Sequence, residues 1–126
     1  MSTRARFDDI RQVVEVRHAG PTKAVDLTDA ALDARRLAAE HGCRNFLVDV
    51  VAIAPLFGYL DVFRLPEEIY DQLDQGPRVR LALLVAPDQP LQQELATYYL
   101  EACRLAGWQV AMFIDRNAAE AWLAAR

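Results

Sequence analysis

The chain has 126 residues, of which 53% are hydrophobic and 25% are charged, and its formal net charge at pH 7 is −4. This length and composition are typical of one globular domain, expected to span residues 1–126, and the acidic balance argues against nucleic-acid binding. No apolar run approaches the roughly 20 residues of a transmembrane helix, and the first residues lack the apolar core of a signal peptide, so we expect a cytoplasmic protein.

Five stretches have the apolar or alternating patterns of β-strands. The predicted strands are residues 3–8, 10–18, 46–51, 79–85 and 108–114. The central stretch is rich in β-branched residues, which predicts a strand buried on both faces. We expect Gly20-Pro21 to end the second strand and Pro55 to interrupt the chain after the third.

The segment after the second strand predicts the first helix. Asp26 and Thr28 are both candidate N-caps for this helix, because their side-chain oxygens can accept hydrogen bonds from free backbone N–H groups. Apolar residues recur on one face as far as His41, and Gly42 is a natural C-terminal stop.

Three more helical regions follow. Residues 56–65 are apolar almost all the way round, and Pro66 is expected to split this region or to begin a new helix. Residues 90–106 form the clearest amphipathic helix, and Asp115 or Asn117 caps a final one. The predicted buried stripe of the 90–106 helix is Leu91, Leu95, Tyr98, Tyr99, Ala102, Leu105 and Ala106. Strands alternating with helices predict an α/β domain with a mostly parallel sheet.

Residues 56–65 carry more apolar side chains than a helix resting on a sheet needs. A surplus of this kind indicates a surface for a ligand, a lipid or a partner protein. We expect an apolar ligand to bind between the 56–75 segment and the 90–106 helix. The expected ligand-binding residues are Phe57, Tyr59, Leu60, Phe63 and Tyr98.

The polar residues provide no recognisable catalytic or metal-binding set. Ser2 is the only serine, so a serine nucleophile on the fold is excluded. Cys43 and Cys103 are interpreted as buried hydrophobic thiols, with Cys43 left as a minor candidate for reactivity. His18 and His41 have no carboxylate at the spacing of a triad or metal site, so both are interpreted as surface or packing residues.

Asp49 is the best single polar candidate, because it interrupts the apolar central strand. A phospho-acceptor aspartate of a receiver domain occupies a comparable place, but that role needs an acidic pair and a late lysine. Lys23 is the only lysine, and the strand of residues 10–18 ends in His18-Ala-Gly where an acidic pair would be needed, so a structural role is favoured. We therefore predict no enzymatic activity, no cofactor, no metal site and no phosphorylation site.

The whole chain resembles the SpoIIAA-like proteins of the STAS superfamily. The segments that carry this resemblance are residues 14–20, Asp26-Leu27 and residues 41–49, 80–87, 107–116 and 121–123. The resemblance implies a single domain with four to five strands, an antiparallel first edge strand, and four to five helices packed largely against one side of the sheet.

The resemblance also bears on function. STAS regulators of the anti-sigma-antagonist type carry a phosphorylatable hydroxyl before a glycine that resembles Gly58, but residues 55–57 here are Pro-Leu-Phe. This departure argues against a phospho-serine switch. Stand-alone SpoIIAA-like proteins are suspected of binding apolar small molecules or lipid through helices near this region.

Two functions of different classes follow. The first is a non-enzymatic cytoplasmic binding module for an apolar small molecule or a lipid surface, peripheral at the membrane in the latter case. The alternative is a protein–protein interaction module, as a homodimer or with a regulatory partner of the anti-sigma type. An enzyme would depend only on Asp49, Cys43 and the two histidines, which form no nucleophile–base pair.

Overall fold

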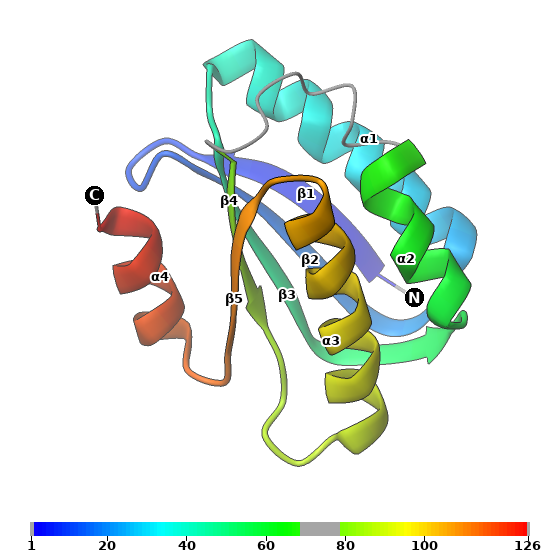
Figure 1. Ribbon diagram of the computed structural model, residues 1–126. Coiled ribbons are helices and arrows are strands. Elements are labelled where there is room, and N and C mark those ends of the chain that lie inside the picture. Colours follow the sequence, from blue (N-terminus) through cyan, green and yellow to red (C-terminus); the bar gives the residue numbers. More distant parts are fainter. Residues whose placement is uncertain (1, 69–78, 126) are drawn as a thin grey trace.

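A computed structural model describes residues 2–68 and 79–125 of the chain and shows an α/β domain (Figure 1). The strands are β1 (Ser2–Asp8), β2 (Val13–Lys23), β3 (Asn45–Leu56), β4 (Arg80–Leu84) and β5 (Gln109–Phe113). The helices are α1 (Ala24–His41), α2 (Tyr59–Glu68), α3 (Pro90–Leu105) and α4 (Arg116–Ala124). Residues 69–75 of the predicted ligand-binding segment lie outside the described residues.

The five described strands form one sheet in the order β1-β2-β3-β4-β5. β1 is antiparallel to β2, and the other neighbouring pairs are parallel. Helices α1, α2 and α3 lie on one side of the sheet, whereas α4 lies on the other (Figure 1). The predicted sheet, its antiparallel edge strand and the one-sided packing of most helices are confirmed.

Alternation along the strands divides the buried side chains between the two faces. Val14, Val16 and Val48 belong to the larger core, beneath α1, α2 and α3. Leu47 and Ala82 point to the other face, where they join a smaller cluster with residues of α4. Because side chains of a strand alternate between faces, both faces of the central strands must be apolar, as the sequence of β3 predicted.

The predicted ends of β2 and β3 are wrong. The pairing of β1 with β2 ends at Ala19, and the pairing of β4 with β3 ends at Asp49. Beyond these points β2 and β3 remain paired with each other as far as Lys23 and Leu56. The result is a two-stranded ribbon that extends past the rest of the sheet. A proline in this ribbon loses little, because no third strand needs its missing N–H.

Two predicted helix boundaries also change, and one of two alternatives at a third is selected. α1 begins at Ala24 with Lys23 as N-cap, and the Asp26 carboxylate accepts a hydrogen bond from the Lys23 N–H at 2.8 Å. α2 contains Pro66 and continues to Glu68, so the proline does not split it within the described residues. Asp115, one of the two alternatives, caps α4 by accepting a hydrogen bond from the Asn117 N–H.

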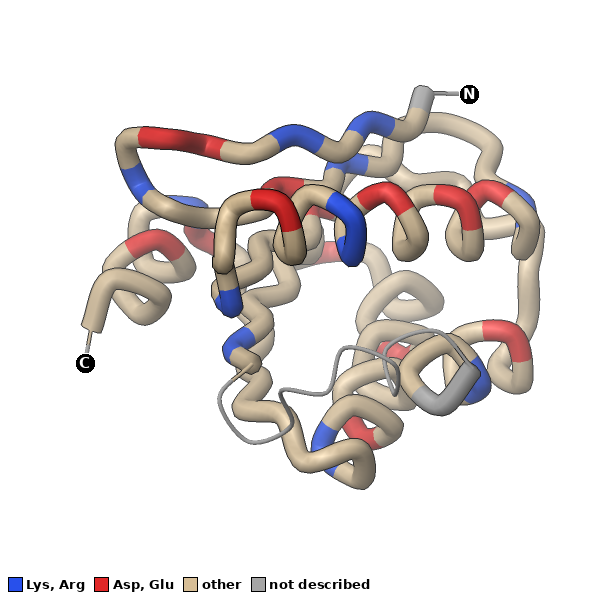
Figure 2. Tube along the Cα trace, turned by 90° about the horizontal axis from the view of Figure 1, so that it is seen from above, with Lys and Arg blue, Asp and Glu red and all other residues tan. Residues whose placement is uncertain are grey.

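Charged residues are spread over several elements (Figure 2). Acidic positions recur along α1, while β1 and the hairpin that follows it carry arginines and aspartates close together (Figure 2). Across the described part of the chain, no single helix presents an unbroken basic face of the kind that binds nucleic-acid phosphates.

Candidate ligand-binding cavity

A cavity of about 70 Å³ lies between the sheet and the layer of helices α1, α2 and α3. Its walls are almost entirely apolar and come from six elements, including Val16 and Val48 of the sheet. Ala30 and Ala31 of α1 and Ala96 of α3 also line it. Small side chains at these three positions leave space between helix and sheet that larger residues would fill.

The cavity reaches the surface where the β2–β3 ribbon passes into α2. Ile53, Pro55 and Phe57 line it at this end and are partly exposed. The ribbon therefore forms one side of the opening, which is the region where the sequence predicted ligand binding.

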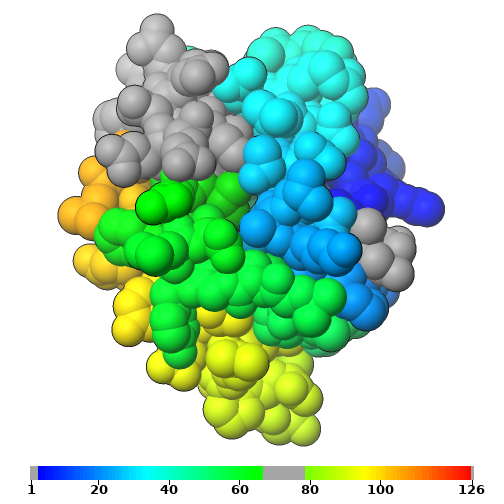
Figure 3. Space-filling view, turned by 90° about the vertical axis from the view of Figure 1, so that its right-hand side faces the viewer, coloured from blue at the N-terminus to red at the C-terminus, as the bar shows by residue number. Residues whose placement is uncertain are grey.

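Helix α2 lies across the cavity. Val62 and Leu65 point inward, line the cavity and are only 5% and 7% exposed. On its outer side α2 contacts α3, where the rings of Tyr59 and Tyr98 lie 4.6 Å apart between centroids. The space-filling view shows α2 at the surface between α1 and α3 (Figure 3). At the start of α2, the Asp61 carboxylate accepts a hydrogen bond from the Gly58 N–H at 2.9 Å.

The structure divides the five predicted ligand-binding residues into two groups. Phe57 lines the cavity. Tyr59, Leu60, Phe63 and Tyr98 lie outside it with exposed fractions of 42%, 68%, 38% and 44%. We call these four residues the outer patch. Their role in binding remains a prediction, and the cavity beneath α2 is the feature that the sequence did not reveal.

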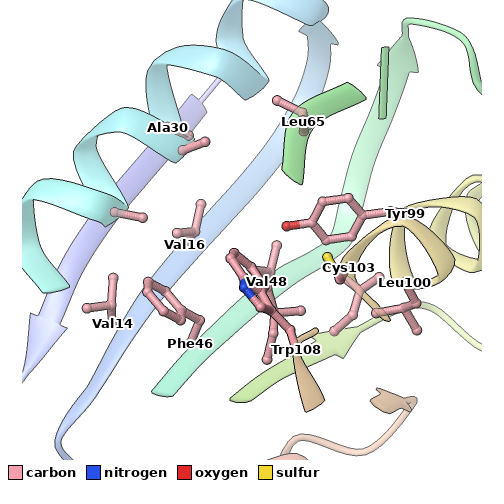
Figure 4. Packing of buried hydrophobic residues seen from close by; sticks show 14 of the residues in the cluster. Val14, Val16, Ala30, Phe46, Val48, Leu65, Tyr99, Leu100, Cys103 and Trp108 are labelled. Carbon is pink, nitrogen blue, oxygen red and sulfur yellow. The ribbon is translucent and has the colours of Figure 1, made fainter. Parts of the chain in front are cut away.

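The predicted buried stripe of α3 is partly wrong. Leu91, Tyr98 and Leu105 are exposed, whereas Gln92 and Leu100 are buried. Cys103 is buried, as predicted. Tyr99 lies in the core, and its hydroxyl is directed from α3 toward β2 (Figure 4). Burial raises the pKa of the Cys103 thiol to about 12, so this cysteine is an unreactive core residue.

His18 is the polar residue that the sequence underrated. It lies on β2 beside a register shift between Arg17 and Ala19, is 4% exposed and lines the cavity. Its Nδ1 is hydrogen-bonded to the Thr3 Oγ1 on the neighbouring strand at 3.1 Å. Burial lowers the pKa of the His18 imidazole to about 4, although the charges of Asp26 and Asp49 oppose this shift. The ring is therefore neutral at pH 7.

Gln92 is the second buried polar residue of the cavity wall. Its Oε1 accepts a hydrogen bond from the Ala86 N–H at 2.6 Å, and its Nε2 donates to the Val51 carbonyl at 3.2 Å. The amide thus joins the β2–β3 ribbon to the segment after β4. This role is structural, because it satisfies two backbone groups that no strand partner reaches.

Asp49 has the structural role that the sequence favoured. It lies on the α4 side of the sheet, where its carboxylate accepts a hydrogen bond from the Val51 N–H and forms an ion pair with Arg116 at 3.6 Å. Arg116 also pairs with Glu15. The two carboxylates share one guanidinium on the face opposite the cavity, so they do not act on anything bound there.

The remaining candidates are dispersed. Cys43 is buried, and its thiol donates to the carbonyls of Gln12 and Asn45. The ring of His41 stacks on Phe7 at 3.9 Å between centroids, far along α1 from the cavity. Among the described residues, no group of three or more His, Cys, Asp or Glu side chains is placed to hold a metal ion.

Comparison with known proteins rests on structure. No protein-family model matches the chain, and its sequence matches no curated protein. The crystal structure of an uncharacterised DUF3478-family protein with a SpoIIAA-like fold, from Shewanella loihica PV-4, is similar to it with a TM-score of 0.60. The match covers 97% of this chain and 92% of that one.

The fold is SpoIIAA-like. At 17% sequence identity the likeness extends to the fold alone and assigns no ligand, partner or activity to this chain. No helix in the described part of the chain is long and apolar enough to cross a membrane.

Proposed function

We propose that this protein is a non-enzymatic binding module that holds an apolar small molecule or the apolar end of a lipid in the cavity beneath α2. The observation that supports this most directly is the cavity wall, which is built almost wholly from apolar side chains of the sheet and three helices. A cavity of this kind is favourable for an apolar group because little ordered water must be displaced from it.

The cavity volume limits what can enter. Its space of about 70 Å³ is smaller than the ~150 Å³ of an engineered cavity that admits benzene. A slender chain fits better than a ring, with its remainder leaving through the opening at Ile53, Pro55 and Phe57. A larger ligand would have to move α2 outward from the sheet. We expect the protein to be cytoplasmic. If the ligand is a lipid, we expect the outer patch to contact the membrane surface.

Native mass spectrometry of gently purified protein tests whether an apolar adduct co-purifies. A direct test uses 1-chlorobutane, a slender probe that makes no strong hydrogen bond, in a titration followed by protein NMR. We expect millimolar binding with shifts confined to residues around the cavity. Ala31→Leu should abolish these shifts, because the added methyl groups occupy the cavity, whereas Ala39→Leu, at an exposed position on the same helix, should preserve them.

The test needs a control for folding of the cavity-filling variant, and the wild-type protein provides the decisive result. Thermal denaturation should show that Ala31→Leu remains folded. If the wild-type protein carries no adduct, gives no shifts with 1-chlorobutane and does not bind vesicles of neutral phospholipid, the proposed function is wrong.

A second candidate is a protein–protein interaction module, which the exposure of the outer patch favours. Leu60 is 68% exposed on α2, and apolar side chains gathered in this way are commonly covered by a partner. Light scattering should then show a dimer that Leu60→Asp converts to a folded monomer. Ile114→Asp is the matched control, because Ile114 is 63% exposed on a different part of the surface. A wild-type monomer would argue against self-association.

A further inference from the structure

The cavity wall contains one polar side chain, His18, with a nitrogen that no described residue bonds. Gln92 is satisfied by two backbone groups, and the Tyr99 hydroxyl interacts with the Cys103 thiol. The His18 imidazole lines the same cavity and is more than nine-tenths buried, with Nδ1 engaged by Thr3. Its second ring nitrogen, Nε2, has no hydrogen-bond partner among the described residues.

His18 Nε2 is not among the side-chain atoms of the described residues that are both sealed from solvent and unpartnered. It therefore opens onto the cavity that His18 lines, where a polar atom of a ligand can replace water. Thr3 and His18 are direct cross-strand neighbours on β1 and β2. The bond between them occupies Nδ1, so Nε2 is the ring nitrogen left for a ligand. The ring is therefore held with a hydrogen-bonding atom at an otherwise apolar wall.

We propose that His18 determines which apolar ligands the cavity accepts, by forming a hydrogen bond through Nε2 with one neutral hydroxyl or carbonyl oxygen on a slender aliphatic molecule. This inference rests on the proposed function and narrows its ligand class.

The absence of a cationic side chain from the described cavity wall favours a ligand with a neutral polar group over a carboxylate. No lysine or arginine among the described residues lines the cavity. A carboxylate there would lose its hydration and would gain only one hydrogen bond from a neutral ring. Protonation of His18 would supply a cation, but the apolar surroundings of the ring oppose its charge.

The test compares three probes of similar size by NMR titration at pH 7: 1-butanol, 1-chlorobutane and sodium butanoate. For the wild-type protein we expect both neutral probes to shift the resonances of the apolar residues that line the cavity. We expect 1-butanol to shift the His18 Nε2 resonance as well, and 1-chlorobutane to leave it unchanged. Butanoate should not bind. His18→Phe should lower the affinity for 1-butanol about tenfold relative to the affinity for 1-chlorobutane, because one hydrogen bond to the ligand is lost.

Thr3→Val is the matched control, because it removes the Thr3–His18 hydrogen bond and keeps the imidazole in the wall. It should retain most of the preference that His18→Phe loses. The Nε2 measurement uses the wild-type chain, so the test does not depend on a folded variant.

The outcomes separate the two proposals. If 1-chlorobutane and 1-butanol bind, but 1-butanol leaves Nε2 unshifted, the role of His18 is wrong and the apolar cavity stands. Tighter binding of butanoate than of 1-butanol also overturns the neutral ligand class. If neither neutral probe binds the wild-type chain, the proposed function fails and this inference fails with it.

Discussion

The titration of His18 gives a prediction that needs no ligand. The pKa of this imidazole is lowered from 6.5 to about 4 by burial in the folded state. Between these values the unfolded chain binds a proton that the folded chain excludes, so the free energy of unfolding decreases as the pH falls through this window. Above pH 6.5 the titration of His18 does not change the free energy of unfolding. Below pH 4 the free energy of unfolding is lower by about 3 kcal/mol, at ~1.4 kcal/mol per pKa unit.

Urea denaturation at several pH values measures this effect as a difference between wild type and His18→Phe. Aspartate and glutamate side chains also titrate near pH 4, but they contribute similarly to both proteins. The two stability curves should therefore separate between pH 6.5 and 4, with the wild type losing more. Parallel curves would show that the imidazole is not shielded from water.

The shared ion pair on the other face of the sheet provides a second residue-scale prediction. Arg116 lies between the carboxylates of Glu15 and Asp49, whose side chains are 11% and 12% exposed. Arg116→Met would leave Asp49 without a cation and Glu15 with only its 3.7 Å pair to Arg6, and it should lower the free energy of unfolding by about 2 kcal/mol. Arg104→Met is the control, because its pair with Glu101 is more than half exposed and should change stability by under about 0.5 kcal/mol.

An equal loss from both variants in urea denaturation would contradict this account. It would mean that the Arg116 network is as weak as an ordinary surface ion pair.

At the scale of a single element, the end of α1 depends on a left-handed glycine. Gly42 has φ +60 and caps the helix through its N–H to the Ala38 carbonyl. A Cβ at this position would meet no atom within 4 Å, so only the backbone conformation is unfavourable for other residues. Gly42→Ala should destabilise the protein by about 1 kcal/mol, measured by chemical denaturation.

Gly58 is a matched control, because a Cβ added there would also meet nothing within 4 Å, but its φ is not positive. Gly58→Ala should leave stability nearly unchanged or raise it slightly by restricting the unfolded chain. A larger loss at Gly58 than at Gly42 would show that the backbone conformation is not the cause.

The elements that the sequence predicted well are those in which a local pattern and the tertiary environment agree. The period of apolar residues and Gly42 place α1, and short apolar runs place β4 and β5. The ribbon of β2 and β3 could not be predicted, because its prolines are tolerated only where neighbouring strands have already ended. That condition is a property of the sheet, not of the local sequence.

The site was predicted only in part for a similar reason. The apolar surplus of residues 56–65 includes Phe57, Val62 and Leu65, which line the cavity, and its role in binding stays a prediction. The alanines of α1 and α3 give no sign by themselves that they face empty space. His18 was interpreted as an ordinary packing residue, since its place in the cavity depends on a register shift beside it in β2.

At the scale of the whole molecule, α4 is the only described helix on its side of the sheet. Arg80 of β4 holds its C-terminal end, with guanidinium nitrogens donating to the carbonyls of Trp122 at 2.8 Å and Leu123 at 3.3 Å. The same guanidinium lies over the Trp122 ring at 4.4 Å. These contacts add donors to the carbonyls of the last turn of α4, where donors within the helix run out.

Arg80→Met should therefore loosen α4 more than the other helices. We expect amide hydrogen exchange in α4 to accelerate about tenfold or more, while α1 and α3 remain protected. Arg36→Met is the control, since Arg36 forms an exposed pair with Glu40 on α1. Uniform acceleration across all helices would instead show that α4 opens only with global unfolding.

The order of the strands has a consequence for how the chain is made. Each strand is bonded to the one synthesised just before it, so no early strand must wait for a late one to complete its pairing. As the polypeptide leaves the ribosome, the hairpin can assemble first and each βα unit can add to its growing edge. Such a chain exposes one unfinished edge at a time, which limits its opportunity to pair with another nascent copy.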